Sequence, residues 1–80
     1  MTEEEAVLIV EARREKLGIS EDMGYASGER AIVEHSRNPE LPGPTEDRVA
    51  WVLRYLADWG HADVFVDVLT GRVLSVRRTP

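Results

Sequence analysis

The first apolar residues of the chain recur with the spacing of a helix. Thr2 and Glu5 match the Thr-x-x-Glu capping box that begins a helix, and Gly18 is suited to end one in a left-handed conformation. We therefore expect a helix over residues 3–17. Its buried stripe would consist of Ala6, Ile9, Val10 and Leu17, with Val7 and Leu8 widening it.

Shorter runs of β-branched residues follow. Residues 30–36, 63–67 and 73–77 are such runs and predict strands. Residues 18–29 contain three glycines and two serines, which favour a loop with at most a short extended piece. Residues 37–45 contain three prolines and predict a connecting loop.

The last two predicted strands are joined by a short turn over residues 68–72. Gly71 can adopt the positive φ that such a turn requires. The carboxylate of Asp67 can accept hydrogen bonds from backbone amides of the turn. Because an isolated hairpin is only marginally stable, this pair needs a third strand or a helix beside it.

Residues 45–60 fit two patterns. As a helix, this stretch would begin at Thr45 and end at Gly60, with Val49, Val52, Leu53 and Leu56 on one face. As a strand, it would alternate, with one face formed by Val49, Trp51, Leu53 and Tyr55. Local propensity does not decide, but the hairpin that follows needs a partner, which favours the strand. The chain is then one α+β domain over residues 1–80, with one N-terminal helix packed on a three- to four-stranded antiparallel sheet.

Composition narrows the functional classes. The 80 residues carry a net charge of −5 and include no cysteine, which excludes disulfides and cysteine zinc sites. Residues 1–40 hold ten Asp/Glu against five Lys/Arg, while residues 41–80 hold five of each. An acidic chain is a poor binder of nucleic acid. The longest apolar run, residues 6–10, is too short to span a membrane, so we expect a cytoplasmic protein with no membrane partner.

The C-terminal half resembles a known family. Residues 64–74 read Val-Phe-Val-Asp-x-x-Thr-Gly-x-Val-Leu, which is similar to the end of PepSY-like domains. Residues 50–54 are similar to the preceding strand of that family, and residues 4–6 to the opening of its helix, so the resemblance covers residues 3–17 and 48–77. Small immunity proteins end in a similar way. The resemblance implies a non-catalytic module that binds another protein, since PepSY-like domains restrain peptidases and sense partners.

Catalytic patterns are weak in this sequence. His35 and His61 are the only histidines. His61 and Asp63 would share one face of a strand, which is a weak signal for a metal site or a catalytic dyad. No serine lies in a Gly-x-Ser-x-Gly setting. We therefore expect no enzyme activity, no metal and no cofactor, and we keep a site at His61 and Asp63 as a minor alternative.

The acidic residues and the aromatic residues together suggest a binding surface. On the strand reading, Trp51, Tyr55 and Trp59 lie on one face, and aromatic side chains are enriched at protein interfaces. The candidate binding residues are Glu3, Glu4, Glu11, Trp51, Tyr55 and Trp59. We expect them to contact another protein, a basic one, in an inhibitor or immunity role. The alternative is a self-associating homodimer formed through an uncovered sheet face or an edge strand.

Overall fold

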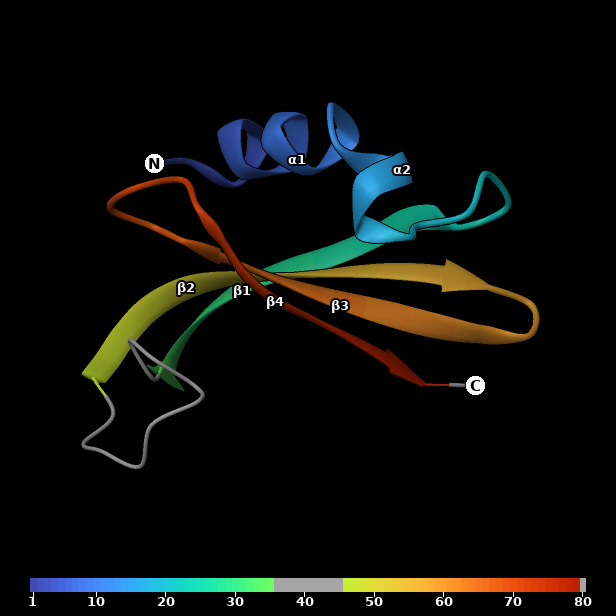
Figure 1. Cartoon of the computed structure of the whole chain (residues 1–80). Coiled ribbons are helices and arrows are strands. Elements are labelled where there is room, and N and C mark those ends of the chain that lie inside the picture. The colour runs from blue at the N-terminus through green and yellow to red at the C-terminus, as the bar shows by residue number, and fades with distance from the viewer. Residues whose placement is uncertain (36–45, 80) are drawn as a thin grey trace.

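The computed structural model describes residues 1–35 and 46–79 and shows two short helices and a four-stranded antiparallel sheet (Figure 1). The sheet order β1-β2-β3-β4 follows the order of the chain. The elements are α1 (Glu3–Glu11), α2 (Arg14–Leu17), β1 (Gly24–His35), β2 (Glu46–Ala57), β3 (Gly60–Asp67) and β4 (Val73–Thr79). The α+β class and the antiparallel sheet are thus confirmed.

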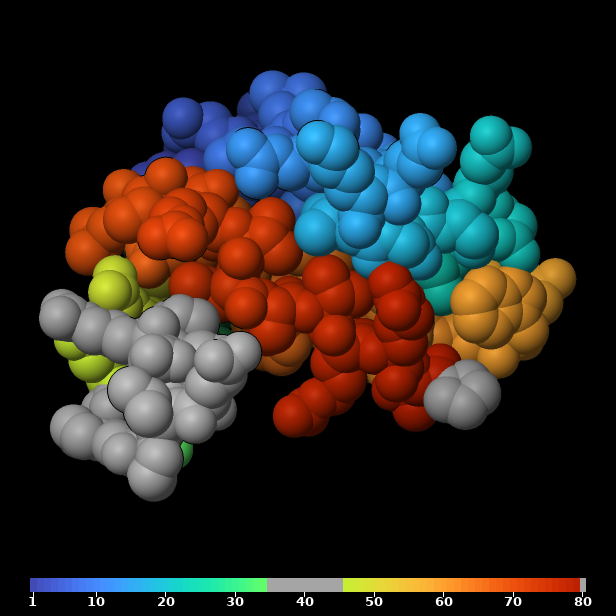
Figure 2. Space-filling view, viewed as in Figure 1, coloured from blue at the N-terminus to red at the C-terminus, as the bar shows by residue number. Residues whose placement is uncertain are grey.

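The helical segment lies over one face of the sheet, as the space-filling view also shows (Figure 2). Ala6 and Val10 of α1 are fully buried and belong to the same apolar core as Leu53, Val64 and Val66 of the sheet. Removing this apolar surface from water is the main force that joins the two layers.

The prediction of one continuous helix over residues 3–17 is wrong. α1 ends at Glu11, and a separate four-residue helix, α2, begins at Arg14. Arg13 between them has φ −125° and ψ 17°, outside the helical region. The Arg14 guanidinium donates hydrogen bonds to the carbonyls of Ser20 (2.7 Å) and Met23 (2.5 Å). These bonds reach residues six and nine positions further along the chain and hold a bend that helix propensity does not reveal. Gly18 then ends α2 with φ 73°.

The first strand begins earlier than its residues predict. β1 starts at Gly24, so residues 24–29 are strand rather than loop, and they pair with β2 through a register shift between Tyr25 and Ser27. Pairing with a neighbouring strand outweighs the low strand propensity of glycine and serine here. The predicted loop over residues 37–45 lies outside the described residues.

The ambiguous stretch is a strand, β2, as the need for a third strand suggested. Its alternation is visible in the packing, since Leu53 and Tyr55 are fully buried beneath the helical layer and Trp51 packs beside them. β2 lies in the middle of the sheet, between β1 and β3. It therefore pairs with β1 on one side and β3 on the other, and it carries core residues on which the helical layer packs.

The turn between β3 and β4 has the predicted chemistry. Asp67 Oδ1 accepts hydrogen bonds from the amides of Leu69 (2.8 Å) and Thr70 (3.2 Å), and Gly71 has φ 73°. Arg48 Nη1 donates to Asp67 Oδ2 at 3.1 Å. Burial of Asp67 acts to raise its pKa, but the two amides and Arg48 together hold this pKa below the ordinary value. The turn lies next to the N-terminal end of α1 (Figures 1 and 2).

Candidate functional site

A groove runs along the outer side of α1, where the helix meets the first residues of β1. It has a volume of about 510 Å³ and is lined by Glu3, Glu4, Val7, Leu8 and Tyr25. Leu8 is 69% exposed and Tyr25 is 37% exposed. The groove thus combines exposed apolar surface with two carboxylates.

The start of α1 determines which residues line this groove. The Thr2 hydroxyl accepts a hydrogen bond from the Glu5 amide (3.2 Å), and the Glu5 carboxylate accepts one from the Thr2 amide (3.0 Å), so the predicted capping box is confirmed. The bond from the Thr2 amide lowers the pKa of Glu5. With Ala6 directed into the core, Leu8 lies toward solvent. Leu8 therefore does not widen the buried stripe, and that prediction is wrong.

A tyrosine and a glycine hold α1 close to β1. The Tyr25 hydroxyl donates a hydrogen bond to Glu3 Oε1, and the Tyr25 ring packs edge-on against Tyr55 with 5.6 Å between centroids. Burial and the bond to Glu3 raise the pKa of Tyr25 to about 12. A Cβ atom on Gly28 would lie 2.5 Å from the Tyr25 hydroxyl and 2.7 Å from Glu3 Oε1. A side chain at position 28 would force the ends of Tyr25 and Glu3 to shift, so glycine lets these two side chains lie close to β1 along one wall of the groove.

Two predicted binding residues, Glu11 and Tyr55, contact each other. Tyr55 is fully buried, and its hydroxyl donates to Glu11 Oε1 at 3.5 Å. Arg14 pairs with Glu11 at 3.1 Å and lies 5.5 Å from the Tyr55 ring centroid. Burial, followed by the charge of Glu11, raises the pKa of Tyr55 to about 12. Tyr55 is therefore a core residue and leaves no side-chain surface for a partner.

The two tryptophans lie in different parts of the molecule. Trp51 is half-buried on β2, where its Nε1 donates to the Met1 carbonyl at 3.0 Å. Trp59 lies beyond the end of β2, in the turn to β3, and is 54% exposed. Its Nε1 donates to Asp22 Oδ2 at 2.6 Å, and this bond, after a stronger one from Ser20, lowers the pKa of Asp22. The predicted aromatic face of three residues is therefore not formed.

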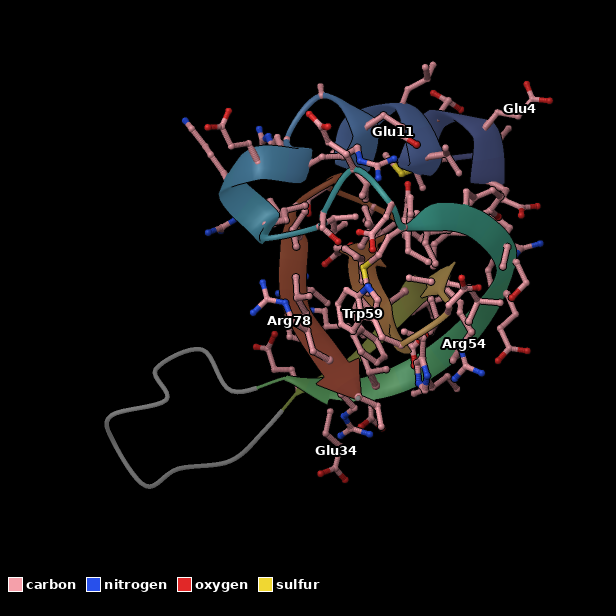
Figure 3. The ribbon with its side chains drawn as sticks, turned by 90° about the vertical axis from the view of Figure 1, so that its right-hand side faces the viewer. Glu4, Glu11, Glu34, Arg54, Trp59 and Arg78 are labelled. Atoms are coloured by element: carbon pink, nitrogen blue, oxygen red, sulfur yellow. The ribbon has the colours of Figure 1, made fainter. Side chains whose placement is uncertain are left out.

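The predicted acidic residues also lie in two different places. Glu3 and Glu4 line the groove, whereas Glu11 lies further along α1 and is engaged by Arg14. Figure 3 shows Glu4 at the start of α1, pointing away from the body of the molecule, and Trp59 well separated from it. Of the predicted set, Glu3 and Glu4 alone line this groove. The structure adds Val7, Leu8 and Tyr25, which the sequence did not single out.

The alternative site at His61 and Asp63 is occupied by an ion pair. Arg54 donates to both Asp63 oxygens, at 2.8 and 3.1 Å, and His61 Nε2 lies 4.0 Å from Asp63 Oδ2. The bond from Arg54 lowers the pKa of Asp63. In residues 1–35 and 46–79, no group of three or more His, Cys, Asp or Glu side chains could hold a metal ion.

Comparisons of the chain with protein-family models, with curated proteins and with solved structures find no match. Within the described part of the chain, no helix has the length and apolar character needed to cross a membrane.

Proposed function

We propose that this chain is a non-catalytic protein-binding module, of the inhibitor or immunity type, which acts in the cytoplasm through the groove between α1 and β1. The expected ligand is a protein segment that presents an apolar side chain flanked by Lys or Arg. The observation that carries the proposal is the 69% exposure of Leu8 in a groove that also contains Glu3 and Glu4.

The apolar part of the groove supplies affinity. Covering an exposed leucine such as Leu8 contributes about 2 kcal/mol from the hydrophobic effect. Tyr25 lies beside it and has the amphipathic character typical of residues that dominate interfaces. The hydrogen bond between Tyr25 and Glu3 already orders these two side chains. Ordering them on binding therefore costs little further conformational entropy.

The carboxylates supply specificity and a faster association. Glu4 is exposed beside Leu8, and residues 1–40 carry five more acidic than basic side chains. Opposite charge on the partner accelerates the encounter, and salt screens this attraction. The proposal therefore favours a basic partner and predicts slower association as the salt concentration rises.

A peptide-display selection against the whole chain tests the proposal. The selected peptides should contain an apolar residue flanked by Lys or Arg. Leu8→Lys should weaken their binding by about tenfold or more, since about 1.4 kcal/mol is one factor of ten. Leu69→Lys is the matched control, because Leu69 is 87% exposed and lies in the β3–β4 turn. Peptides that bind both variants and the unchanged protein equally would contradict the proposal.

A second variant, Glu4→Gln, tests the electrostatic attraction of the partner. Glu4→Gln keeps the size and the helix propensity of the side chain and removes its charge. It should reduce the association rate of the selected peptides at low salt and leave the rate at high salt nearly unchanged. Equal rates for both proteins at low salt would exclude electrostatic attraction by Glu4.

A further inference from the structure

The two edge strands of the sheet differ in length and in the signs of their charges. β4 has seven residues, and its charged residues Arg77 and Arg78 are both basic, which disfavours pairing of β4 with a second copy of itself. β1 has twelve residues and carries both signs of charge, with Glu29, Arg30 and Glu34. In the described part of the chain, β1 pairs only with β2, so its outer edge is available.

The second half of this edge carries exposed apolar surface. Ile32 is 73% exposed and lies opposite Val49 of β2, which is 47% exposed. Residues opposite each other on antiparallel strands share a face, so these two side chains form a small apolar patch. The patch lies beside an open strand edge, where a pairing strand would cover it.

The neighbouring pair on the same face has an unfavourable arrangement. Glu34 lies directly opposite Asp47, and both side chains are exposed. Like charges at opposite positions destabilise a sheet, and a cation beside them would relieve the repulsion. Figure 3 shows Glu34 near the end of β1, pointing away from the body of the molecule, where a second chain could reach it.

We propose that a second copy of this chain pairs antiparallel with β1, with the twofold axis at Ile32. Two identical antiparallel strands related by a twofold axis place one residue opposite its own copy. An axis at Glu29 or Arg30 brings like charges together, and an axis at Ala31 places Arg30 opposite the partner's Ile32. An axis at Ile32 places Arg30 opposite the partner's Glu34 on both sides of the axis.

This register also agrees with the faces of the strand. Arg30, Ile32 and Glu34 are alternate residues of β1 and share one face. Arg30 is exposed, with its guanidinium 5.4 Å from the Trp51 ring centroid. The partner's Arg30 would then meet Glu34 close to Asp47, where the repulsion is found. The interface joins two sheets into one eight-stranded sheet, and it uses residues other than those of the groove.

The oligomeric state of the whole chain, measured by sedimentation, tests this inference. The unchanged protein should have twice the 9.0 kDa mass of one chain. Arg30→Glu and Glu34→Arg should each weaken the dimer by about tenfold or more, because both cross-strand pairs become repulsive. An equimolar mixture of the two variants should dimerise again, since every pair then has opposite charges.

Control variants distinguish pairing in this register from a general effect of surface charge. Lys16→Glu and Glu21→Arg change exposed charges outside β1 and should leave the dimer intact. Ile32→Lys changes an exposed side chain, so it should fold normally yet place two ammonium groups at the axis and give monomers. Specific dimers have dissociation constants far below about 1 mM. An unchanged protein that stays monomeric at about this concentration would therefore overturn the inference. A mixture of Arg30→Glu with Glu34→Arg that stays monomeric would overturn the register.

Discussion

The carboxylate of Asp67 is expected to be the most important polar group for stability among the described residues of the β3–β4 turn. Its side chain receives hydrogen bonds from the amides of Leu69 and Thr70 and from Arg48. A hydrogen bond to a charged group contributes about 1.5 kcal/mol at the lower end of its range. Counting the two shorter bonds, Asp67→Ala should lower the free energy of unfolding by about 3 kcal/mol. A chain of this size has roughly 4–12 kcal/mol in total.

A second variant separates the turn from the ion pair. Asp67→Asn keeps an oxygen that can accept from Leu69 and Thr70 but loses the charge that attracts Arg48. Asp67→Asn should lower the free energy of unfolding by about 1 kcal/mol, clearly less than Asp67→Ala does. Urea unfolding followed by tryptophan fluorescence measures both values. Asp58→Ala, at an exposed aspartate in the other turn, is the control and should change little. Equal losses for Asn and Ala would refute the assignment of the stability to the turn amides.

The same group gives the protein a dependence on pH. The folded-state pKa of Asp67 lies below its ordinary value of 3.8. The ionised Asp67 therefore contributes its full share of the free energy of unfolding at pH values above this ordinary pKa. That stability is lost as the pH falls through the folded-state pKa. The Asp67→Asn variant should lose less stability than the unchanged protein over this acidic range. An identical acid dependence for the two proteins would contradict the role of Asp67.

Two further measurements test the burial of the tyrosines and the close approach of Tyr25 and Glu3 to Gly28. Tyr25 and Tyr55 are the only tyrosines, and both have a pKa of about 12. Absorbance at alkaline pH should therefore change near pH 12, and stability should fall between about pH 10 and 12 as unfolded tyrosines ionise first; a titration at pH 10 in the folded protein would contradict this. Gly28→Ala should destabilise the protein by about 1–3 kcal/mol through overpacking against Tyr25 and Glu3. Gly24→Ala, with no atom within 4 Å of the added methyl, should not, and equal effects of the two changes would contradict the close approach at Gly28.

Local chemistry predicted much of the fold. The capping box at Thr2 and the turn at Asp67 depend on neighbours within three residues, so the sequence specified both. The break between α1 and α2 depends on bonds from Arg14 to Ser20 and Met23, which form only after the chain has turned back. Residues 24–29 become strand only because β2 pairs with them. Such tertiary effects override local propensity.

The candidate site was less accessible to sequence reasoning. Residues 6–10 are five consecutive apolar residues, and helical spacing alone does not show which of them faces the sheet. The sequence therefore predicts Leu8 on the buried side, whereas it lies in the groove. It predicts Tyr25 in a loop, and only the structure places this residue against Glu3. The sequence predicts Glu3 and Glu4 as binding residues because acidic side chains are in excess over residues 1–40.

The central claim is that a partner binds in the groove between α1 and β1. The most direct measurement is the change in backbone amide chemical shifts of the whole chain when a selected peptide is added. The account predicts that the largest changes lie at residues 3–8 and around Tyr25. Largest changes in the β2–β3 turn around Trp59, with residues 3–8 unaffected, would contradict it.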